Sequence, residues 1–131
     1  MYTDIVIDHF TNPRNVGVIK NADGFGKVES AVCGDMMELY VMVEDGVIAD
    51  IKYRTFGCAA AIASSSIATE MVKGQPLSVA AELTDEEVDA ALGGLPNAKL
   101  HCSLLAVSAL HTAIEDYLQK HPEARAALAQ G

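Results

Sequence analysis

The chain has 131 residues and a net charge of −9, from 18 acidic and 9 basic side chains. This length suits one domain with a real core, and a negative surface repels phosphate backbones, which argues against nucleic-acid binding. No apolar run approaches the ~18 residues that a membrane span needs, and the N-terminal residues include Asp4 and Asp8 without the basic region of a secretion signal. We therefore expect a cytoplasmic protein in which residues 1–131 form a single domain.

The chain contains three cysteines, Cys33, Cys58 and Cys102, with no close pair among them. A disulfide framework would leave one thiol over and would require an oxidising compartment. In a reducing cytosol, cysteines are more often buried, catalytic or bound to a metal, so composition alone leaves these three roles open.

The first predicted element is a short helix over residues 2–11. Ile5, Ile7 and Phe10 recur at helical spacing, and the helix should end before Pro13 because a residue before proline avoids the helical region. We interpret His9 as a partly buried, hydrogen-bonded helix residue rather than as a metal ligand.

Three antiparallel strands should follow over residues 26–32, 37–43 and 47–56. Gly46 supplies positive φ for a hairpin turn between the last two strands. Ile48, Ile51 and Tyr53 do not alternate perfectly, which predicts a bulge or a twist in the third strand. One face of such a meander has to be covered by helices.

Helices are predicted over residues 59–73 and 101–120, with a short acidic helix between them. The first has small side chains almost all round and is therefore expected to be buried, while Thr84 and Glu87 have the spacing of a capping box that opens the acidic helix. Residues 95–99 should form an exposed, stiff loop, and Pro122 should begin a last helical turn. The final helix carries an apolar stripe formed by Leu104, Val107, His111, Ile114 and Leu118, where His111 is expected at the edge of the core. The predicted fold class is α+β, a three-stranded antiparallel sheet packed against several helices.

Each cysteine falls at a junction between predicted elements. Cys33 lies between the first two strands, Cys58 between the third strand and a helix, and Cys102 at the start of the last helix. Neighbouring ends of elements can meet at one rim, where loops carry function, and helix N-termini stabilise anions such as thiolates. We predict that the three cysteines meet in one metal or cluster site, although their wide spacing also allows unrelated thiols.

Two further side chains extend this candidate ligand set to five: Asp35, two residues after Cys33, and His101, next to Cys102. A structural zinc site takes four ligands, and a [2Fe-2S] cluster normally takes four thiolates. With three thiolates, an oxygen or nitrogen must complete either site. A surplus of candidate ligands also permits one ligand to replace another.

Five segments together resemble the iron–sulfur cluster assembly scaffold family, IscU and the N-terminal domain of NifU, and the match extends over nearly the whole chain. They are residues 12–17 (Asn-Pro-Arg-Asn-Val-Gly), 33–35 (Cys-Gly-Asp), 55–58 (Thr-Phe-Gly-Cys), 60–66 (Ala-Ala-Ile-Ala-Ser-Ser-Ser) and 99–103 (Lys-Leu-His-Cys-Ser). The resemblance implies an α+β fold with a three-stranded antiparallel sheet. It also implies a scaffold and carrier protein rather than an enzyme.

The resemblance implies that sulfur arrives as persulfide from a cysteine desulfurase, combines with iron from a donor into a [2Fe-2S] cluster, and passes to apo-proteins. By this resemblance Cys33, Cys58 and Cys102 are the cluster thiolates and Cys102 is the leading persulfide acceptor. Asp35 is the labile oxygen ligand and His101 the alternate nitrogen ligand. Zinc is expected to bind in the same pocket.

Three comparisons with the family qualify these expectations. Its chaperone-binding segment is usually Leu-Pro-Pro-Val-Lys, whereas residues 95–99 are Leu-Pro-Asn-Ala-Lys here, which puts chaperone docking in doubt. SufU-like zinc-dependent sulfur-transfer proteins, the main alternative, have a long insertion and no histidine beside the last cysteine, and this chain shows neither feature. NifU proper continues into further domains, so a chain ending at residue 131 is expected to be a standalone scaffold domain.

Two enzyme classes also fit parts of the pattern. A zinc hydrolase would use three protein ligands and an open position but needs a general base. A cysteine nucleophile would need a histidine base, and the adjacent His101 and Cys102 have poor geometry for that pairing.

Overall fold

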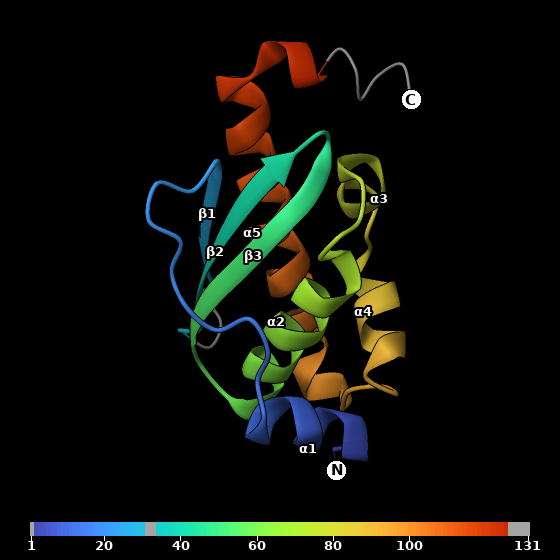
Figure 1. Cartoon of the computed structure of the whole chain (residues 1–131). Coiled ribbons are helices and arrows are strands. Elements are labelled where there is room, and N and C mark those ends of the chain that lie inside the picture. Colours follow the sequence, from blue (N-terminus) through green and yellow to red (C-terminus); the bar gives the residue numbers. More distant parts are fainter. Residues whose placement is uncertain (1, 31–33, 126–131) are drawn as a thin grey trace.

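The computed structural model describes residues 2–30 and 34–125 of the chain. Figure 1 shows a three-stranded sheet with the long helix α5 and the helix α2 on one side of it. The elements are α1 (Asp4–Thr11), β1 (Gly24–Glu29), β2 (Met36–Glu44), β3 (Val47–Phe56), α2 (Ala59–Val72), α3 (Leu77–Ala81), α4 (Asp85–Ala91), the 3-10 turn η1 (Asn97–Lys99) and α5 (Leu100–Lys120). Residues 122–125 add a last helical turn, as predicted. The predicted α+β class is confirmed.

The sheet has the order β1-β2-β3, and both strand pairs are antiparallel. Gly46 has a φ of 75° in the turn between β2 and β3, which confirms the predicted hairpin. The predicted irregularity is also present, since Met42 pairs with Asp50 but Val43 pairs with Ile48. This leaves one extra residue in β3. The bulge explains why Ile48 and Ile51, three positions apart, are both fully buried.

The contact between β1 and α5 brings the two backbones together without side chains between them. A Cβ atom placed on Gly26 would lie 2.4 Å from the carbonyl oxygen of Ala109 and 2.6 Å from the amide nitrogen of Ala113. A Cβ atom on Gly24 would lie 2.3 Å from the carbonyl oxygen of Ala113. The two glycines therefore permit α5 to lie directly on the first strand.

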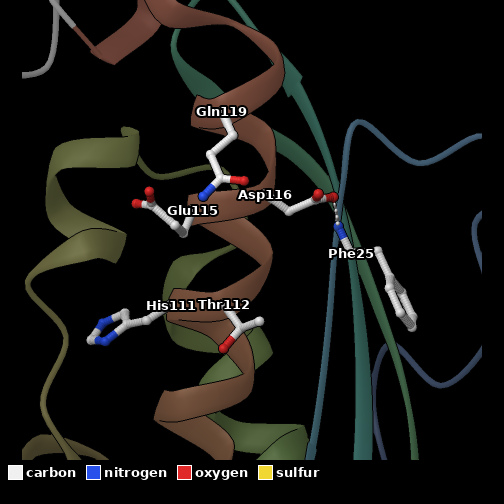
Figure 2. A pocket seen from close by; sticks show the side chains of 6 residues that line it. All are labelled: Phe25, His111, Thr112, Glu115, Asp116 and Gln119. Atoms are coloured by element: carbon white, nitrogen blue, oxygen red, sulfur yellow. Dashed lines mark hydrogen bonds between the residues drawn. The ribbon is translucent and has the colours of Figure 1, made fainter.

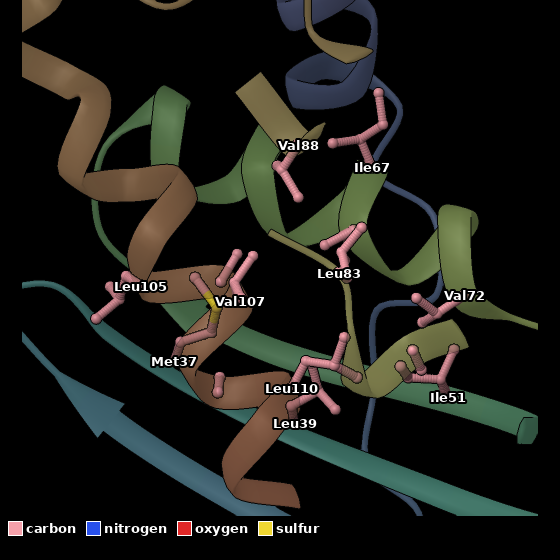
Figure 3. Close-up of a cluster of buried hydrophobic side chains, with 14 of the residues drawn as sticks. Met37, Leu39, Ile51, Ile67, Val72, Leu83, Val88, Leu105, Val107 and Leu110 are labelled. Carbon is pink, nitrogen blue, oxygen red and sulfur yellow. The ribbon is translucent and has the colours of Figure 1, made fainter. Parts of the chain in front are cut away.

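A single hydrophobic core fills the space between the sheet and the helices (Figure 3). Met37, Leu39 and Val41 alternate along β2 and are at most 1% exposed, as expected for strand positions that face one side. The predicted burial of α2 is confirmed, because even Ser64, Ser65 and Ser66 have no exposed surface.

Helix α1 packs on α2 through a polar contact. His9 Nδ1 and Ser66 Oγ lie 2.7 Å apart, and the same hydroxyl accepts a hydrogen bond from the Arg14 amide at 3.0 Å. Burial lowers the pKa of His9, and the nearby charge of Arg14 adds to this effect. The interpretation of His9 as a buried, hydrogen-bonded residue is confirmed.

Three bounds of the predicted elements are wrong at α1 and β1. α1 begins at Asp4 rather than at residue 2; its fully buried apolar residue is Val6, whereas Ile5, Ile7 and Phe10, whose spacing predicted the helix, are each more than 40% exposed. β1 begins at Gly24 rather than at residue 26 and ends at Glu29. The end of the predicted strand, with Cys33 after it, reaches residues 31–33, which lie outside the described residues.

Further corrections concern the second half of the chain. The short helix α3 was not predicted, because its five residues give too little periodicity. Residues 95–99 are not a wholly exposed loop, since Leu95 is buried and donates its amide hydrogen to Asp89 Oδ1, and η1 follows it. Leu104 is 52% exposed rather than part of the buried stripe, while Leu110 is fully buried. Thr84 and Glu87 do form the predicted capping box.

None of the described helices combines the length and apolar character that crossing a membrane requires.

Replacing Gly26 by alanine should loosen the contact between β1 and α5. The new methyl group would lie against backbone atoms of α5, so we expect a loss in the free energy of unfolding of about 3 kcal/mol, the upper end of the usual overpacking cost. Gly46→Ala is the matched control, because its Cβ meets no atom within 4 Å and only the positive φ costs about 1 kcal/mol. Urea denaturation measures both. Equal losses in the two variants would contradict the close packing at Gly26.

Candidate metal centre

The beginnings of β2, α2 and α5 meet at one end of the molecule, the lower end in Figure 1. Asp35 directly precedes β2, Cys58 is the N-cap residue of α2, and Cys102 is the third residue of α5. The three side chains come from segments that are distant in sequence, and the fold of the sheet against α2 and α5 brings them together.

The three potential ligand atoms of Asp35, Cys58 and Cys102 all lie within 4.8 Å of one another. The Sγ atoms of Cys58 and Cys102 are 3.9 Å apart, and Cys102 Sγ is 4.0 Å from Asp35 Oδ2. Cys102 is fully buried, Asp35 is 5% exposed and Cys58 is half-buried. Two thiols and a carboxylate this close together form a compact donor set for a metal ion that accepts sulfur and oxygen ligands.

The carboxylate of Asp35 is buried, and the described part of the chain places no cationic partner beside it. Among residues 2–30 and 34–125, no lysine, arginine or histidine lies within ion-pair distance of it. A buried charge is costly unless it is paired or binds a metal. This carboxylate therefore fits a cation bound between it and the two thiols.

Gly57 provides the space that the Asp35 carboxylate occupies. A Cβ atom on Gly57 would lie 2.6 Å from Asp35 Oδ1 and 2.7 Å from its Cγ. The φ of Gly57 is not in the left-handed region. The available signal was its position beside a candidate ligand.

Two helix N-termini point toward the site. Cys58 caps α2 and Cys102 lies in the first turn of α5, where free backbone amides favour negative charge. Lys99, the N-cap residue of α5, adds a positive charge nearby: the Cys58 thiolate is the main cause that raises the pKa of this lysine. Sequence reasoning did not single out Lys99. These surroundings stabilise thiolates, the form that binds metals.

His101 lies at the edge of this group rather than within it. Its Nε2 is 3.7 Å from Cys102 Sγ, yet it does not belong to the set of mutually close ligand atoms. The helix α5 begins at Leu100, one residue before the predicted start, so both His101 and Cys102 lie in its first turn. Their side chains nevertheless approach each other at the start of the helix.

The structure thus brings together three of the five predicted ligands, with His101 beside them. The fifth, Cys33, lies outside the described residues. Its sequence neighbours, Gly34 and Asp35, are described, and Asp35 is part of the site.

A hollow lies elsewhere on the molecule, along the C-terminal half of α5. Figure 2 shows its lining residues, which include His111, Glu115 and Asp116 of α5 and Phe25 of β1. The space, about 550 Å³, is wide open and contains no cysteine. His111 is half-buried, as expected for the edge of the core, and it lies apart from the group of Asp35, Cys58 and Cys102.

Comparisons with known proteins identify the family of this chain. The family model of the NifU-like N-terminal domain matches residues 1–124. A curated relative, the iron–sulfur cluster assembly scaffold protein IscU 1 of Archaeoglobus fulgidus, is 58% identical over 121 residues, which cover 92% of this chain and 79% of the relative.

Solved structures share the fold. A NifU-like N-terminal protein from Brucella abortus superposes with a TM-score of 0.72 at 20% identity, covering 90% of this chain and 94% of that one. A candidate assembly scaffold for the SUF system from Fervidobacterium islandicum gives a TM-score of 0.70 at 25% identity, covering 86% and 96%. From its sequence and its fold, the chain belongs to the NifU-like N-terminal domain family of iron–sulfur cluster assembly scaffolds.

Proposed function

We propose that this protein builds a [2Fe-2S] cluster from iron and persulfide sulfur and then passes the cluster to apo-proteins. Cys58 and Cys102, together with Cys33, supply the thiolates, and Asp35 supplies an exchangeable oxygen ligand. His101 is the alternate nitrogen ligand. In this role the protein is a scaffold and carrier rather than a catalyst, and it acts as a single domain over residues 1–131.

The observation that supports this proposal is the group formed by Asp35, Cys58 and Cys102 at two helix N-termini. Thiolates suit iron, zinc and iron–sulfur clusters, whereas a carboxylate is a harder and less strongly bound ligand for such a centre. A mixed donor set holds a cluster less firmly than four thiolates do. That property fits a cluster that has to be transferred.

Sulfur transfer to Cys102 follows from ordinary thiol exchange. The Cys102 thiolate attacks the outer sulfur of the desulfurase persulfide, a new S–S bond forms on Cys102, and the desulfurase cysteine leaves as a thiolate. Reduction of this sulfur to sulfide takes two electrons from an external donor. Lys99 and the α5 N-terminus stabilise the attacking thiolate.

The partners in this proposal are a cysteine desulfurase, an iron donor and apo iron–sulfur proteins. A chaperone that reads residues 95–99 is a further partner only if it accepts Asn97 and Ala98, which are exposed in η1. Because the thiols must stay reduced, we place the reaction in a reducing compartment, the cytoplasm. Zinc is expected to occupy the same ligands when iron is scarce.

The alternative is a SufU-like zinc protein that accepts sulfur without building a cluster, and the shared fold does not separate the two. Anaerobic incubation with a cysteine desulfurase, cysteine, ferrous iron and a reductant does. We expect the visible absorption of a [2Fe-2S] cluster to develop on the protein, whereas a zinc relay would accept sulfur and remain colourless.

The same assay tests Cys102. A Cys102→Ser variant should capture no persulfide, measured by mass spectrometry before iron is added, because a hydroxyl is not nucleophilic enough at neutral pH. Ser108→Ala, a half-buried position one and a half turns further along α5, is the control and should react as the parent does. Full capture by Cys102→Ser would move the acceptor role to Cys58 or Cys33.

Asp35→Ala should give a cluster that lasts longer and transfers more slowly, since the weakest ligand is the natural point of exchange. We expect its transfer rate to an apo-ferredoxin to fall by about tenfold or more, the usual scale for losing a group at a metal site. Absorption decay measures the lifetime, and circular dichroism follows the transfer. Glu44→Ala, which removes an exposed carboxylate at the far hairpin, is the control, and an Asp35→Ala variant that matches it would refute the role of Asp35.

A further inference from the structure

Gly57 lies opposite Asp35 in an extension of the sheet. Met36 of β2 pairs with Phe56 of β3 as the last pair of the ladder. Asp35 and Gly57 are the next residues beyond this pair, one on each strand. Side chains alternate along a strand, which puts Asp35 on the same face as Met37, the face that the helices cover. The missing side chain at Gly57 is therefore on the inner side, where the carboxylate lies.

The space left open at Gly57 is bounded on two sides. A Cβ atom on Gly57 would be 2.6 Å from Asp35 Oδ1, and on its other side 3.2 Å from the Cβ of Ala61 in the first turn of α2. Real Cβ atoms do not approach closer than 3.0 Å, and the neighbouring helix limits any movement away from Asp35. A side chain at position 57 would have to displace the carboxylate from the position where Oδ2 is 4.0 Å from Cys102 Sγ.

The backbone does not require glycine at this position. Gly34, Gly46, Gly74 and other glycines have φ between 70° and 150°, but Gly57 is not among the residues with positive φ. No positive φ therefore favours glycine over alanine here. Space for the carboxylate is the requirement that remains.

His101 is the competing ligand near Cys102. Its Nε2 is 3.7 Å from Cys102 Sγ, slightly closer than the carboxylate oxygen at 4.0 Å. The carboxylate of Asp35 and the imidazole of His101 are therefore near the same thiol, and the group that can reach the metal more easily completes the donor set. Removing the carboxylate leaves the imidazole as the nearest replacement.

We propose that Gly57 is a positioning residue that selects Asp35 over His101 as the ligand completing the metal centre. Its absent side chain admits the carboxylate, and any larger residue there transfers the position to the imidazole. This inference deepens the proposed function by assigning what makes the oxygen ligand available. It concerns metal binding alone and does not depend on whether a cluster is built.

The test is a set of zinc affinities, measured by competition with a chromophoric chelator. In the parent protein Asp35→Ala should weaken zinc binding by about tenfold, and His101→Ala should change it by less than about threefold, a difference of under one kcal/mol. In the Gly57→Ala background the pattern should reverse. His101→Ala should then cost about tenfold, and Asp35→Ala should have no effect.

A direct readout accompanies the affinities. With ¹⁵N-labelled histidine, the ring nitrogens of His101 in zinc-loaded Gly57→Ala should show the shift of metal coordination, whereas those of the zinc-loaded parent should not. Gly74→Ala is the matched control, because its methyl group would meet no atom within 4 Å at a site beyond the end of α2. It should keep the parent pattern despite the strain of its positive φ.

The stability of the fold provides a check on Gly57→Ala itself. If the new methyl group strains the protein only through the carboxylate, Asp35→Ala should recover the lost stability, so the double variant should unfold at a higher temperature than Gly57→Ala.

Zinc binding by folded Gly57→Ala that still depends on Asp35 would overturn the proposal, as would a complete loss of zinc binding. If the dependence of zinc affinity shifts from Asp35 to His101 in Gly57→Ala but the parent protein forms no cluster, only the proposed scaffold function is refuted.

Discussion

The direct contact between the backbones of α5 and β1 is the constraint on which the site depends. Gly24 and Gly26 remove the side chains that would otherwise separate the helix from the strand. This contact fixes where α5 lies on the sheet, and thereby where its first turn, with Cys102, is placed. The small side chains of α2 allow a similar close approach on the β3 side. Three elements consequently begin at the same end of the molecule.

The negative charges of the Asp35 carboxylate and the cysteine thiolates at this end would repel each other by more than the nearby positive groups compensate. Two unit charges 4 Å apart repel each other by about 4 kcal/mol at an effective dielectric constant of 20, and Asp35 Oδ2 and Cys102 Sγ are 4.0 Å apart. A helix N-terminus returns at most about 2 kcal/mol, and Lys99 is half-buried, so that solvent partly screens its charge. A divalent cation bound between these groups would offset their mutual repulsion.

Sequence patterns predicted the helices and strands whose periodicity extends over many residues, and the junctions between elements where the candidate ligands lie. The bulge in β3, the burial of α2, the capping box at Thr84 and the convergence on Cys58 and Cys102 all left local signals. The orientation of single apolar residues left no such signal. Ile7 and Leu104 fit helical spacing but are exposed, because neighbouring elements rather than periodicity decide which face of a helix is covered. The requirement for Gly57 arises from a residue more than twenty positions away and cannot be seen in one sequence.

The ligands of this site differ in kind, and that difference has a structural origin. Cys58 and Cys102 are anchored on helices whose positions the core fixes, whereas Asp35 stands at the end of a strand, beyond the last ladder pair, and occupies a gap left by a glycine. A carboxylate in such a gap can leave by rotating about its own side-chain bonds, without moving a helix. His101 Nε2 lies 3.7 Å from Cys102 Sγ. In the proposed function, the two thiolates keep a metal bound while the oxygen position opens, and release begins at Asp35, the weakest donor and the least constrained one.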